Sequence, residues 1–278
     1  MSYLAYHFIV TPPQPGSDIL IAHISEMGFE AFDYSEAGFV GYIKKELEEG
    51  INLDDLTYDD FSYTCEIEKI PITNWNAEWE KNFEPVFVDE LLVIRAPFHD
   101  SVPNVKHEIV IMPKMSFGTG HHQTTRLMCK EMFGADLKDK SVLDMGCGTG
   151  ILAILAKLLG ADQVTGIDID EWSVENSIEN CAVNHHPGII IKKGDVNSLA
   201  TENAFDVILA NINKNILKAD IPYYSGSLNA GGRLLLSGFF TTDAEELKEV
   251  AGKNNLRFIS MRNENEWAMM VFEKTNNA

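Results

Sequence analysis

Residues 142–150 read VLDMGCGTG, an apolar strand that runs into a turn with glycine at every second position. Residues 151–160 follow with the apolar pattern of a buried helix. Glycines let a ligand approach the backbone closely, and the amino end of the next helix carries a partial positive charge. Dinucleotide-binding turns have the spacing G-x-G-x-x-G/A, but here Ile151 occupies the third required position. The G-x-G-x-G spacing, with Asp144 before it, favours the amino-acid end of S-adenosylmethionine over a pyrophosphate.

Strands and helices alternate downstream of this turn. We expect strands at residues 141–145, 163–169, 189–192, 205–211 and 233–237, with helices between them, including 172–183. Short apolar strands of this kind indicate a parallel sheet that is covered on both faces. The final strands, 258–262 and 268–273, flank a polar turn and predict an antiparallel hairpin. The predicted fold class is therefore α/β, a doubly wound, Rossmann-like domain with a C-terminal antiparallel hairpin.

Polar residues stand where three of these strands end. Asp168 follows Gly146 by 22 residues, at the place where a doubly wound fold puts the acceptor for ribose hydroxyls. Asp170 is expected to cap the helix that follows. Asp195 ends the third strand, where it either meets an adenine amino group or serves a turn. Asn211 ends the fourth strand, where it either accepts a hydrogen bond from an amine or caps the next helix.

Residues 115–125 read MSFGTGHHQTT, a loop rich in hydroxyl groups and imidazoles that precedes a helix predicted at 126–133. A loop of this composition before a nucleotide fold is expected to be functional, or else to cap the helix through Thr124 or Thr125. The adjacent pair His121 and His122 does not have the spacing of metal ligands, and the same holds for His185 and His186. No metal site is expected.

The first hundred residues have a different pattern. A strand at 2–11, a helix at 17–27 and strands at 31–34, 39–44 and 63–70 indicate a small α+β unit, which we expect to be ferredoxin-like. Trp75, Trp79 and Phe83 recur every four residues and predict an amphipathic helix. The expected domains are therefore a recognition domain at 1–72, a linker with this helix at 73–100 and a catalytic domain at 101–278.

Charge is distributed unevenly over the 278 residues. The net charge is −20, and residues 1–100 hold 20 acidic and 5 basic side chains, which gives 5 − 20 = −15. This balance argues against stable nucleic-acid binding and favours a cationic partner. The four cysteines have no C-x-x-C spacing, which fits a reducing compartment. Because the N-terminus lacks a signal-peptide pattern and no stretch is long enough to span a bilayer, we expect a soluble, cytoplasmic protein.

Four segments, FGTGHHQTT, LDMGCGTGILAILAKLLGA, GIDIDEWSVENSIEN and ILANINKNIL, occur in this order between residues 117 and 217. Together they closely resemble the bacterial ribosomal protein L-eleven (L11) methyltransferase family, and WNAEW at 75–79 resembles the segment between that family's two domains. The resemblance implies an S-adenosylmethionine-dependent enzyme, a monomer, that methylates lysine ε-amines and the N-terminal α-amine of ribosomal protein L11. It also implies that the cofactor contacts are Thr125, Gly146, Asp168 and Asn211.

Further cofactor contacts are expected from Phe117, Gly118, Thr119 and Gly148 of the same segments, and from Asp195 at the end of the third strand. The expected reaction is the in-line attack of a neutral amine on the sulfonium methyl group. Asn211 is expected to orient the amine without a dedicated general base, and His121 or His122 is the alternative as a base. Three other functions are disfavoured. A methyltransferase of rRNA does not fit the acidic balance, and one of another protein, a small amine or glutamine does not fit FGTGHHQTT. A non-catalytic cofactor-binding protein does not fit the intact glycines, Asp168 and Asn211, and a nicotinamide oxidoreductase does not fit Ile151.

Overall fold

The structure is a computed structural model that describes residues 3–53, 56–69, 83–114, 116–199 and 205–275. The chain divides into two units, Met1–Phe83 and Glu84–Ala278. The amphipathic helix expected around Trp75 and Trp79 lies outside the described residues. Each unit has its own core and is described by itself.

The smaller unit is an antiparallel sheet with one helix. In chain order it contains β1 (Tyr3–Thr11), α1 (Pro13–Ser25), β2 (Ala31–Ser35), β3 (Gly38–Lys44), the 3-10 segment η1 (Lys45–Gly50) and β4 (Ser62–Lys69). The strand order is β2-β3-β1-β4, and every neighbouring pair is antiparallel. These are the helix and strands that the sequence predicts. Alternate residues of β1, such as Tyr6 and Phe8, pack with Leu20 and Ile24 of α1 in the unit's core.

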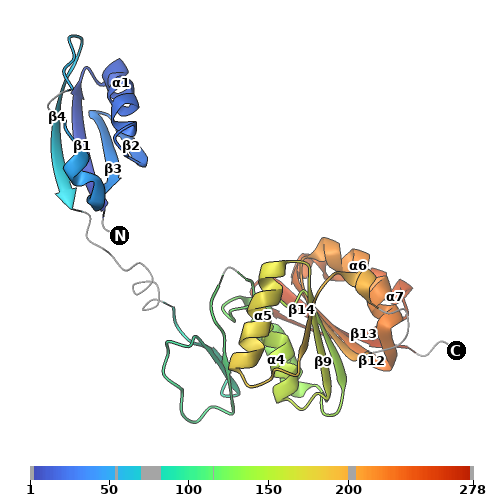
Figure 1. Cartoon of the computed structure of the whole chain (residues 1–278). Helices are drawn as coiled ribbons and strands as arrows, with labels where there is room; N and C mark the ends of the chain where they lie inside the picture. Colours follow the sequence, from blue (N-terminus) through green and yellow to red (C-terminus); the bar gives the residue numbers. More distant parts are fainter. Residues whose placement is uncertain (1–2, 54–55, 70–82, 115, 200–204, 276–278) are drawn as a thin grey trace. The chain divides into compact units, whose positions relative to one another are not determined.

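The larger unit is a sheet with helices on both faces (Figure 1). Its first part contains β5 (Val86–Val88), β6 (Leu92–Arg95), β7 (His107–Val110), α3 (Gln123–Gly134), β8 (Ser141–Met145), α4 (Ile151–Leu158), β9 (Gln163–Asp168) and α5 (Glu171–Val183). Its second part contains β10 (Ile190–Lys193), η2 (Val196–Ser198), β11 (Phe205–Asn211), α6 (Lys214–Ser227), β12 (Leu228–Phe240), η3 (Thr241–Asp243), α7 (Ala244–Lys253), β13 (Leu256–Glu264) and β14 (Trp267–Lys274).

The main sheet has the strand order β10-β9-β8-β11-β12-β14-β13. The first five strands are parallel, whereas β14 is antiparallel to both β12 and β13. The chain order reverses between β8 and β11, and doubly wound sheets bind ligands at the carboxyl ends of the strands beside such a reversal.

The two faces of the sheet are covered by two separate cores. Along β11, Val207 and Leu209 pack toward α3 and α4, while Ile208 and Ala210 pack toward α6 and α7. Because successive side chains of a strand point to opposite faces, a continuous apolar strand must be buried on both sides. This alternation explains why the sequence of β11 has no polar residue between Val207 and Ala210.

A three-stranded sheet, β5-β6-β7, extends the core on the α3 and α4 side. Its residues Val88, Leu92 and Ile94 are buried there, so strands of the larger unit occupy part of the range 73–100 that the sequence predicted as a linker. The larger compact unit thus begins at Glu84. Short β-branched strands need a partner to bury their side chains, and α3 and α4 provide it.

Side-chain amides of α5 hold the edge of this smaller sheet. Asn184 Oδ1 accepts a hydrogen bond from the Val110 amide at 2.8 Å, and Asn184 Nδ2 donates to the Val110 carbonyl at 2.6 Å. Asn180 Oδ1 accepts from the Met112 amide at 2.8 Å. These asparagines therefore pair with the backbone at the end of β7 and just after it, as a neighbouring strand would.

Among the described residues, no helix is long and apolar enough to cross a membrane.

Candidate functional site

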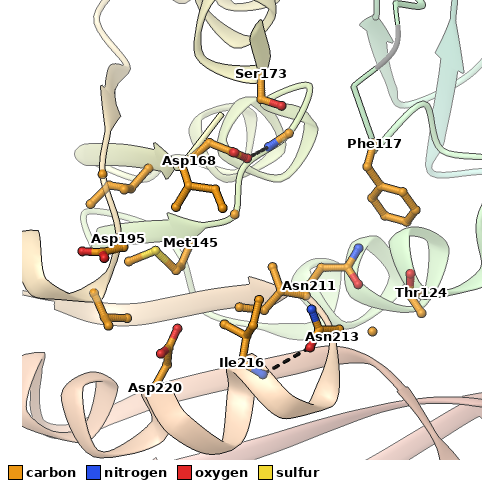
Figure 2. Close-up of a pocket in the computed structure, with 18 of the residues that line it drawn as sticks. Phe117, Thr124, Met145, Asp168, Ser173, Asp195, Asn211, Asn213, Ile216 and Asp220 are labelled. Carbon is orange, nitrogen blue, oxygen red and sulfur yellow. Dashed lines mark hydrogen bonds between the residues drawn. The ribbon is translucent and has the colours of Figure 1, made fainter. Parts of the chain in front are cut away.

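A cavity of about 470 Å³ lies at the carboxyl ends of β8, β9 and β11 (Figure 2). This volume falls within the range of small-molecule sites. Two groups of residues form it. We call the first the strand-end wall, which consists of Gly146, Gly148, Asp168, Asp195 and Asn211.

The glycine turn after β8 forms the floor of the strand-end wall. Gly146 and Gly148 have φ values of +71° and +55°, which residues with a Cβ rarely adopt. A Cβ on Gly146 would overlap the side chain of Ile212, and a Cβ on Gly148 would overlap the carbonyl oxygen of Phe117. The sequence therefore needs glycine at both positions, and the bare backbone is left facing the cavity.

Asp168 is held in place by the same turn. Its Oδ2 accepts a hydrogen bond from the Gly148 amide at 2.9 Å, and its Oδ1 accepts one from the Asp170 amide at 3.0 Å. Figure 2 shows the first of these bonds beside the cavity. Each carboxylate oxygen has a second lone-pair direction, so Asp168 can still accept from hydroxyl groups of a ligand. As predicted, Asp170 caps α5, accepting from the Trp172 amide.

Asn211 presents a buried oxygen that has no partner. Its Nδ2 donates to Thr125 Oγ1 over 3.5 Å, whereas its Oδ1 is buried without a hydrogen bond among the described residues. Thr125 itself is fully buried in α3 and does not line the cavity. Asn213, not Asn211, caps α6. A buried carbonyl oxygen without a donor is costly, and a bound amine would supply that donor.

The loop before α3 contributes to two hollows. Phe117 and His122 line the main cavity. Gly118, Thr119 and His121 line a neighbouring hollow of about 320 Å³. The loop is bonded to the glycine turn, because the Thr149 amide donates to the Phe117 carbonyl at 2.9 Å and Thr149 Oγ1 donates to the Gly118 carbonyl at 2.7 Å.

The two adjacent histidines have different surroundings. His121 Nε2 bonds the Glu84 carbonyl at 3.1 Å, and its Nδ1 bonds Thr119 Oγ1 at 3.1 Å, so both ring nitrogens are engaged away from the main cavity. His122 caps α3 by accepting from the Thr124 amide on Nδ1. The cap is thus a histidine instead of the expected Thr124 or Thr125. Burial, together with the charge of Arg126, lowers the pKa of His122.

The second group of lining residues is aromatic. We call Phe117, His122 and Trp267 the aromatic wall. The His122 and Trp267 rings meet edge to face with centroids 4.6 Å apart, and the Phe117 and His122 centroids are 5.4 Å apart. Phe240 packs behind Trp267 at 4.3 Å.

Several residues of the cavity were not predicted from the sequence. His122 was considered only as a metal ligand or base, and Trp267, Ser173, Asp220 and Gly238 were not singled out. Trp267 begins β14, directly after the hairpin turn, where a large aromatic residue beside a polar turn was the available signal. Asp220 lies within α6, where one carboxylate on an ordinary helix gives no signal at all.

The charge of the lining indicates what kind of ligand fits. Asp168, Asp195 and Asp220 face the cavity, and none of its lining residues is lysine or arginine. A pyrophosphate would meet three carboxylates without a compensating cation, while a sulfonium cation would be attracted. The glycine floor, the carboxylate after β9 and the acidic lining together fit S-adenosylmethionine, which offers ribose hydroxyls and a positive charge.

A fourth carboxylate lies beneath the glycine turn. Asp144 is 1% exposed, and its Oδ2 accepts from the Ala153 amide at 3.0 Å. Burial raises the pKa of Asp144 to about 7. Among the described residues, no three His, Cys, Asp or Glu side chains gather as a metal-binding group.

Comparison with known proteins identifies relatives over nearly the whole chain. Residues 31–275 match the family model of ribosomal protein L11 methyltransferase (PrmA). The ribosomal protein L11 methyltransferase of Bacteroides thetaiotaomicron is 43% identical over 278 residues, which cover 98% of this chain and 99% of that protein. The corresponding protein of Chlorobaculum tepidum is 34% identical, and the match covers 93% of each chain.

A solved structure agrees with these relatives. The ribosomal protein L11 methylase of Lactobacillus delbrueckii subsp. bulgaricus is 28% identical, with a TM-score of 0.65 over 70% of this chain and all of that one. The matching sequences, the strand order and the cavity at the strand ends are consistent with one another. The chain therefore belongs to the ribosomal protein L11 methyltransferase family.

Proposed function

We propose that this protein transfers methyl groups from S-adenosylmethionine to amino groups of ribosomal protein L11, both lysine ε-amines and the N-terminal α-amine. One observation carries the chemistry: Asn211 places a buried oxygen without a partner at the end of β11. An amine is a hydrogen-bond donor, and it would satisfy this oxygen. The family to which the chain belongs supports ribosomal protein L11 as the substrate.

The chain's own residues orient the amine and exclude water from it. The cofactor, when bound, supplies a methyl group bonded to a positively charged sulfur, and an amine can displace the sulfur from this methyl carbon. Asn211 Oδ1 accepts a hydrogen bond from the amine and so directs its lone pair toward the methyl carbon. A bond forms between the amine nitrogen and this carbon as the bond between carbon and sulfur breaks. The nitrogen then releases a proton to solvent.

The amine must be neutral before it attacks, and we propose that desolvation achieves this without a general base. A free lysine has a pKa near ~10.4, and an apolar surround lowers the pKa of an amine. The aromatic wall provides such a surround. His121 is a poor candidate because both of its ring nitrogens are engaged. His122 accepts on Nδ1, so its neutral ring carries the proton on Nε2 and cannot take another there.

We also propose that Thr125, Gly118 and Thr119 position other parts of the site and do not contact the cofactor. Thr125 accepts a hydrogen bond from Asn211, and Gly118 and Thr119 lie on the loop that Thr149 holds. Gly146, Gly148, Asp168, Asp195 and Phe117 are proposed to contact it directly.

The smaller unit is proposed to recognise the protein substrate. Its strand order β2-β3-β1-β4 with α1 after β1 supports a ferredoxin-like plan in which η1 replaces the second helix. Its acidic composition supports a lysine-rich partner. We further propose that the protein is a soluble, cytoplasmic monomer.

The proposed reaction can be tested directly. The purified protein is incubated with methyl-labelled S-adenosylmethionine and purified ribosomal protein L11, and the methyl groups are located by mass spectrometry. We expect methylation of lysine and α-amino groups, and a rate that falls about a hundredfold in Asn211→Ala at saturating cofactor.

Asn215→Ala is the matched control, because Asn215 is an exposed residue of the same segment and does not line the cavity. If the cofactor binds but no labelled methyl group is found on ribosomal protein L11, this protein is not the substrate. Equal rates for Asn211→Ala and Asn215→Ala would remove the proposed role of Asn211.

A further inference from the structure

The cavity has two ends with different chemistry. Figure 2 shows Asn211 and Phe117 on one side, and Asp195 and Asp220 on the opposite side. Asp168, the candidate acceptor for ribose hydroxyls, lies between these two sides. A cofactor whose methyl group is near Asn211 and whose ribose is near Asp168 must place its base near the two remaining carboxylates.

These two carboxylates are not equally available. Asp195 caps η2, and its two oxygens accept from the backbone amide and the side-chain Nδ2 of Asn197, at 2.9 and 3.0 Å. The residue is also exposed. Both of its oxygens thus already accept a hydrogen bond from Asn197, and solvent reaches the carboxylate.

Asp220 differs in both respects. The hydroxyl of Tyr224, one helical turn further on in α6, donates to Asp220 Oδ2 at 3.1 Å. Tyr224 is fully buried, so this bond holds the carboxylate in one orientation. The other oxygen, Oδ1, has no hydrogen-bond partner among the residues that the structure describes. Figure 2 shows the carboxyl group pointing from α6 toward the cavity.

On the proposed cofactor, we infer that Asp220 Oδ1 accepts a hydrogen bond from the exocyclic amine of the adenine and makes the site specific for that base. A charged acceptor forms stronger hydrogen bonds than a neutral one. Partial burial of Asp220, and repulsion from Asp195, raise the pKa of Asp220. A hydrogen-bond donor beside Asp220 would offset both the burial of its charge and the repulsion from Asp195.

The inference can be tested by binding alone, without turnover. S-Inosylhomocysteine differs from S-adenosylhomocysteine only in the base, where a carbonyl replaces the exocyclic amine and the neighbouring ring nitrogen N1 carries a proton. A carbonyl facing Asp220 sets two acceptors against each other. We expect calorimetry to show that the unsubstituted protein prefers S-adenosylhomocysteine by roughly ten- to a hundredfold, which is the range of one charge-assisted hydrogen bond.

Asp220→Asn should weaken this selection, because its amide can donate to the carbonyl of the inosine analogue. We expect the preference to fall by about tenfold or more, while S-inosylhomocysteine binds more tightly than it does to the unsubstituted protein. Tyr224→Phe should reduce the preference less, since it only frees the orientation of Asp220.

Two matched variants separate this role from the others. Asp195→Asn makes the same change on the neighbouring carboxylate and should weaken both ligands without changing the ratio of their affinities. Asp168→Asn should weaken both ligands equally, since they share the ribose. If Asp220→Asn leaves the preference unchanged, or if Asp195→Asn is the variant that alters it, the assignment of Asp220 is overturned. Failure of the unsubstituted protein to bind S-adenosylhomocysteine would instead overturn the proposed cofactor.

Discussion

The strand-end wall and the aromatic wall differ in how their residues are spaced along the chain. The strand-end wall comes from segments that each follow a strand, at 146–148, 168, 195 and 211, and parallel pairing brings their ends together. The aromatic wall joins residue 117 and residue 122 to residue 267, which the β13–β14 turn carries. The first arrangement is built into the topology, whereas the second depends on the packing of α3 against the hairpin.

This difference corresponds to a difference in task. A cofactor with fixed polar groups needs directional partners, and strand ends supply them at regular spacing. An amine that must lose its charge needs an apolar surround, and aromatic rings provide one whatever the spacing of their residues along the chain. The two walls can therefore be tested separately, since damage to one should affect cofactor binding and damage to the other should affect the protein substrate.

The largest effect is expected from Gly148→Ala. The added Cβ would overlap the Phe117 carbonyl at a φ of +55°, so the strand-end wall and the loop would have to move apart. We expect affinity for S-adenosylhomocysteine, measured by calorimetry, to fall by about a hundredfold or more. In the control Gly252→Ala, no atom lies within 4 Å of the new Cβ, and α7 should gain about 0.5–1 kcal/mol. Equal affinities in the two variants would contradict the proposed floor.

Trp267→Ala is expected to act on the other wall. Loss of the ring removes the contacts to His122 at 4.6 Å and to Phe240 at 4.3 Å, and water can then reach the amine. The methylation rate of ribosomal protein L11 should fall by about tenfold, while the affinity for S-adenosylhomocysteine changes little. Trp267→Phe keeps a ring and should recover most of the rate. A parallel loss of cofactor affinity in Trp267→Ala would mean that the walls do not divide the work as proposed.

Thr149 connects the two walls and should give an intermediate result. Thr149→Val keeps the shape of the side chain but removes the hydrogen bond from Oγ1 to the Gly118 carbonyl. We expect the Michaelis constant for S-adenosylmethionine to rise about fivefold, as one buried hydrogen bond is worth roughly 1 kcal/mol. Thr149→Ser retains the hydroxyl and should stay near the unsubstituted value. If the serine variant is as impaired as the valine variant, the methyl group and not the hydroxyl matters.

The smallest effect is expected on stability, from Asp144→Asn. In the folded protein the pKa of Asp144 is about 7, above its ordinary value of 3.8, because the side chain is buried. The unfolded chain therefore loses this proton first, and the wild-type protein loses stability as the pH rises from about 4 to about 7.

Asparagine does not titrate, and its carbonyl can still accept from the Ala153 amide. The melting temperature of Asp144→Asn relative to the wild type should rise across that window, by about 2–4 °C for each kcal/mol of stability, and level off above it. A difference that does not change with pH between 4 and 8 would show that Asp144 is not protonated in the folded state.

The sequence was sufficient to predict the strand-end wall for physical reasons. Gly146 and Gly148 occupy backbone conformations that exclude other residues, and Asp168 lies at a fixed interval after them. The order of strands and helices also followed from the alternation of apolar segments, because a parallel sheet covered on both faces permits few arrangements.

Other features depended on contacts that no local pattern contains. The Asn211 oxygen is significant only because α3 occupies its amide nitrogen and leaves the oxygen without a partner. The two histidines are adjacent in sequence, yet only His122, the residue that caps α3, lines the main cavity. Strand β7 was not predicted, since its four residues, His107–Val110, are too few to show a period.

The asparagines of α5 have a practical consequence for dividing the chain. An exposed strand edge offers unpaired backbone groups on which another chain can pair and aggregate, and Asn180 and Asn184 occupy those groups after β7. A fragment that began at residue 101, where the sequence alone suggests a boundary, would lose β5 and β6 and strip one side of β7. A fragment that begins at Glu84 keeps all three strands together with the helix that shields them. It is therefore the fragment to express when the cofactor site is studied alone.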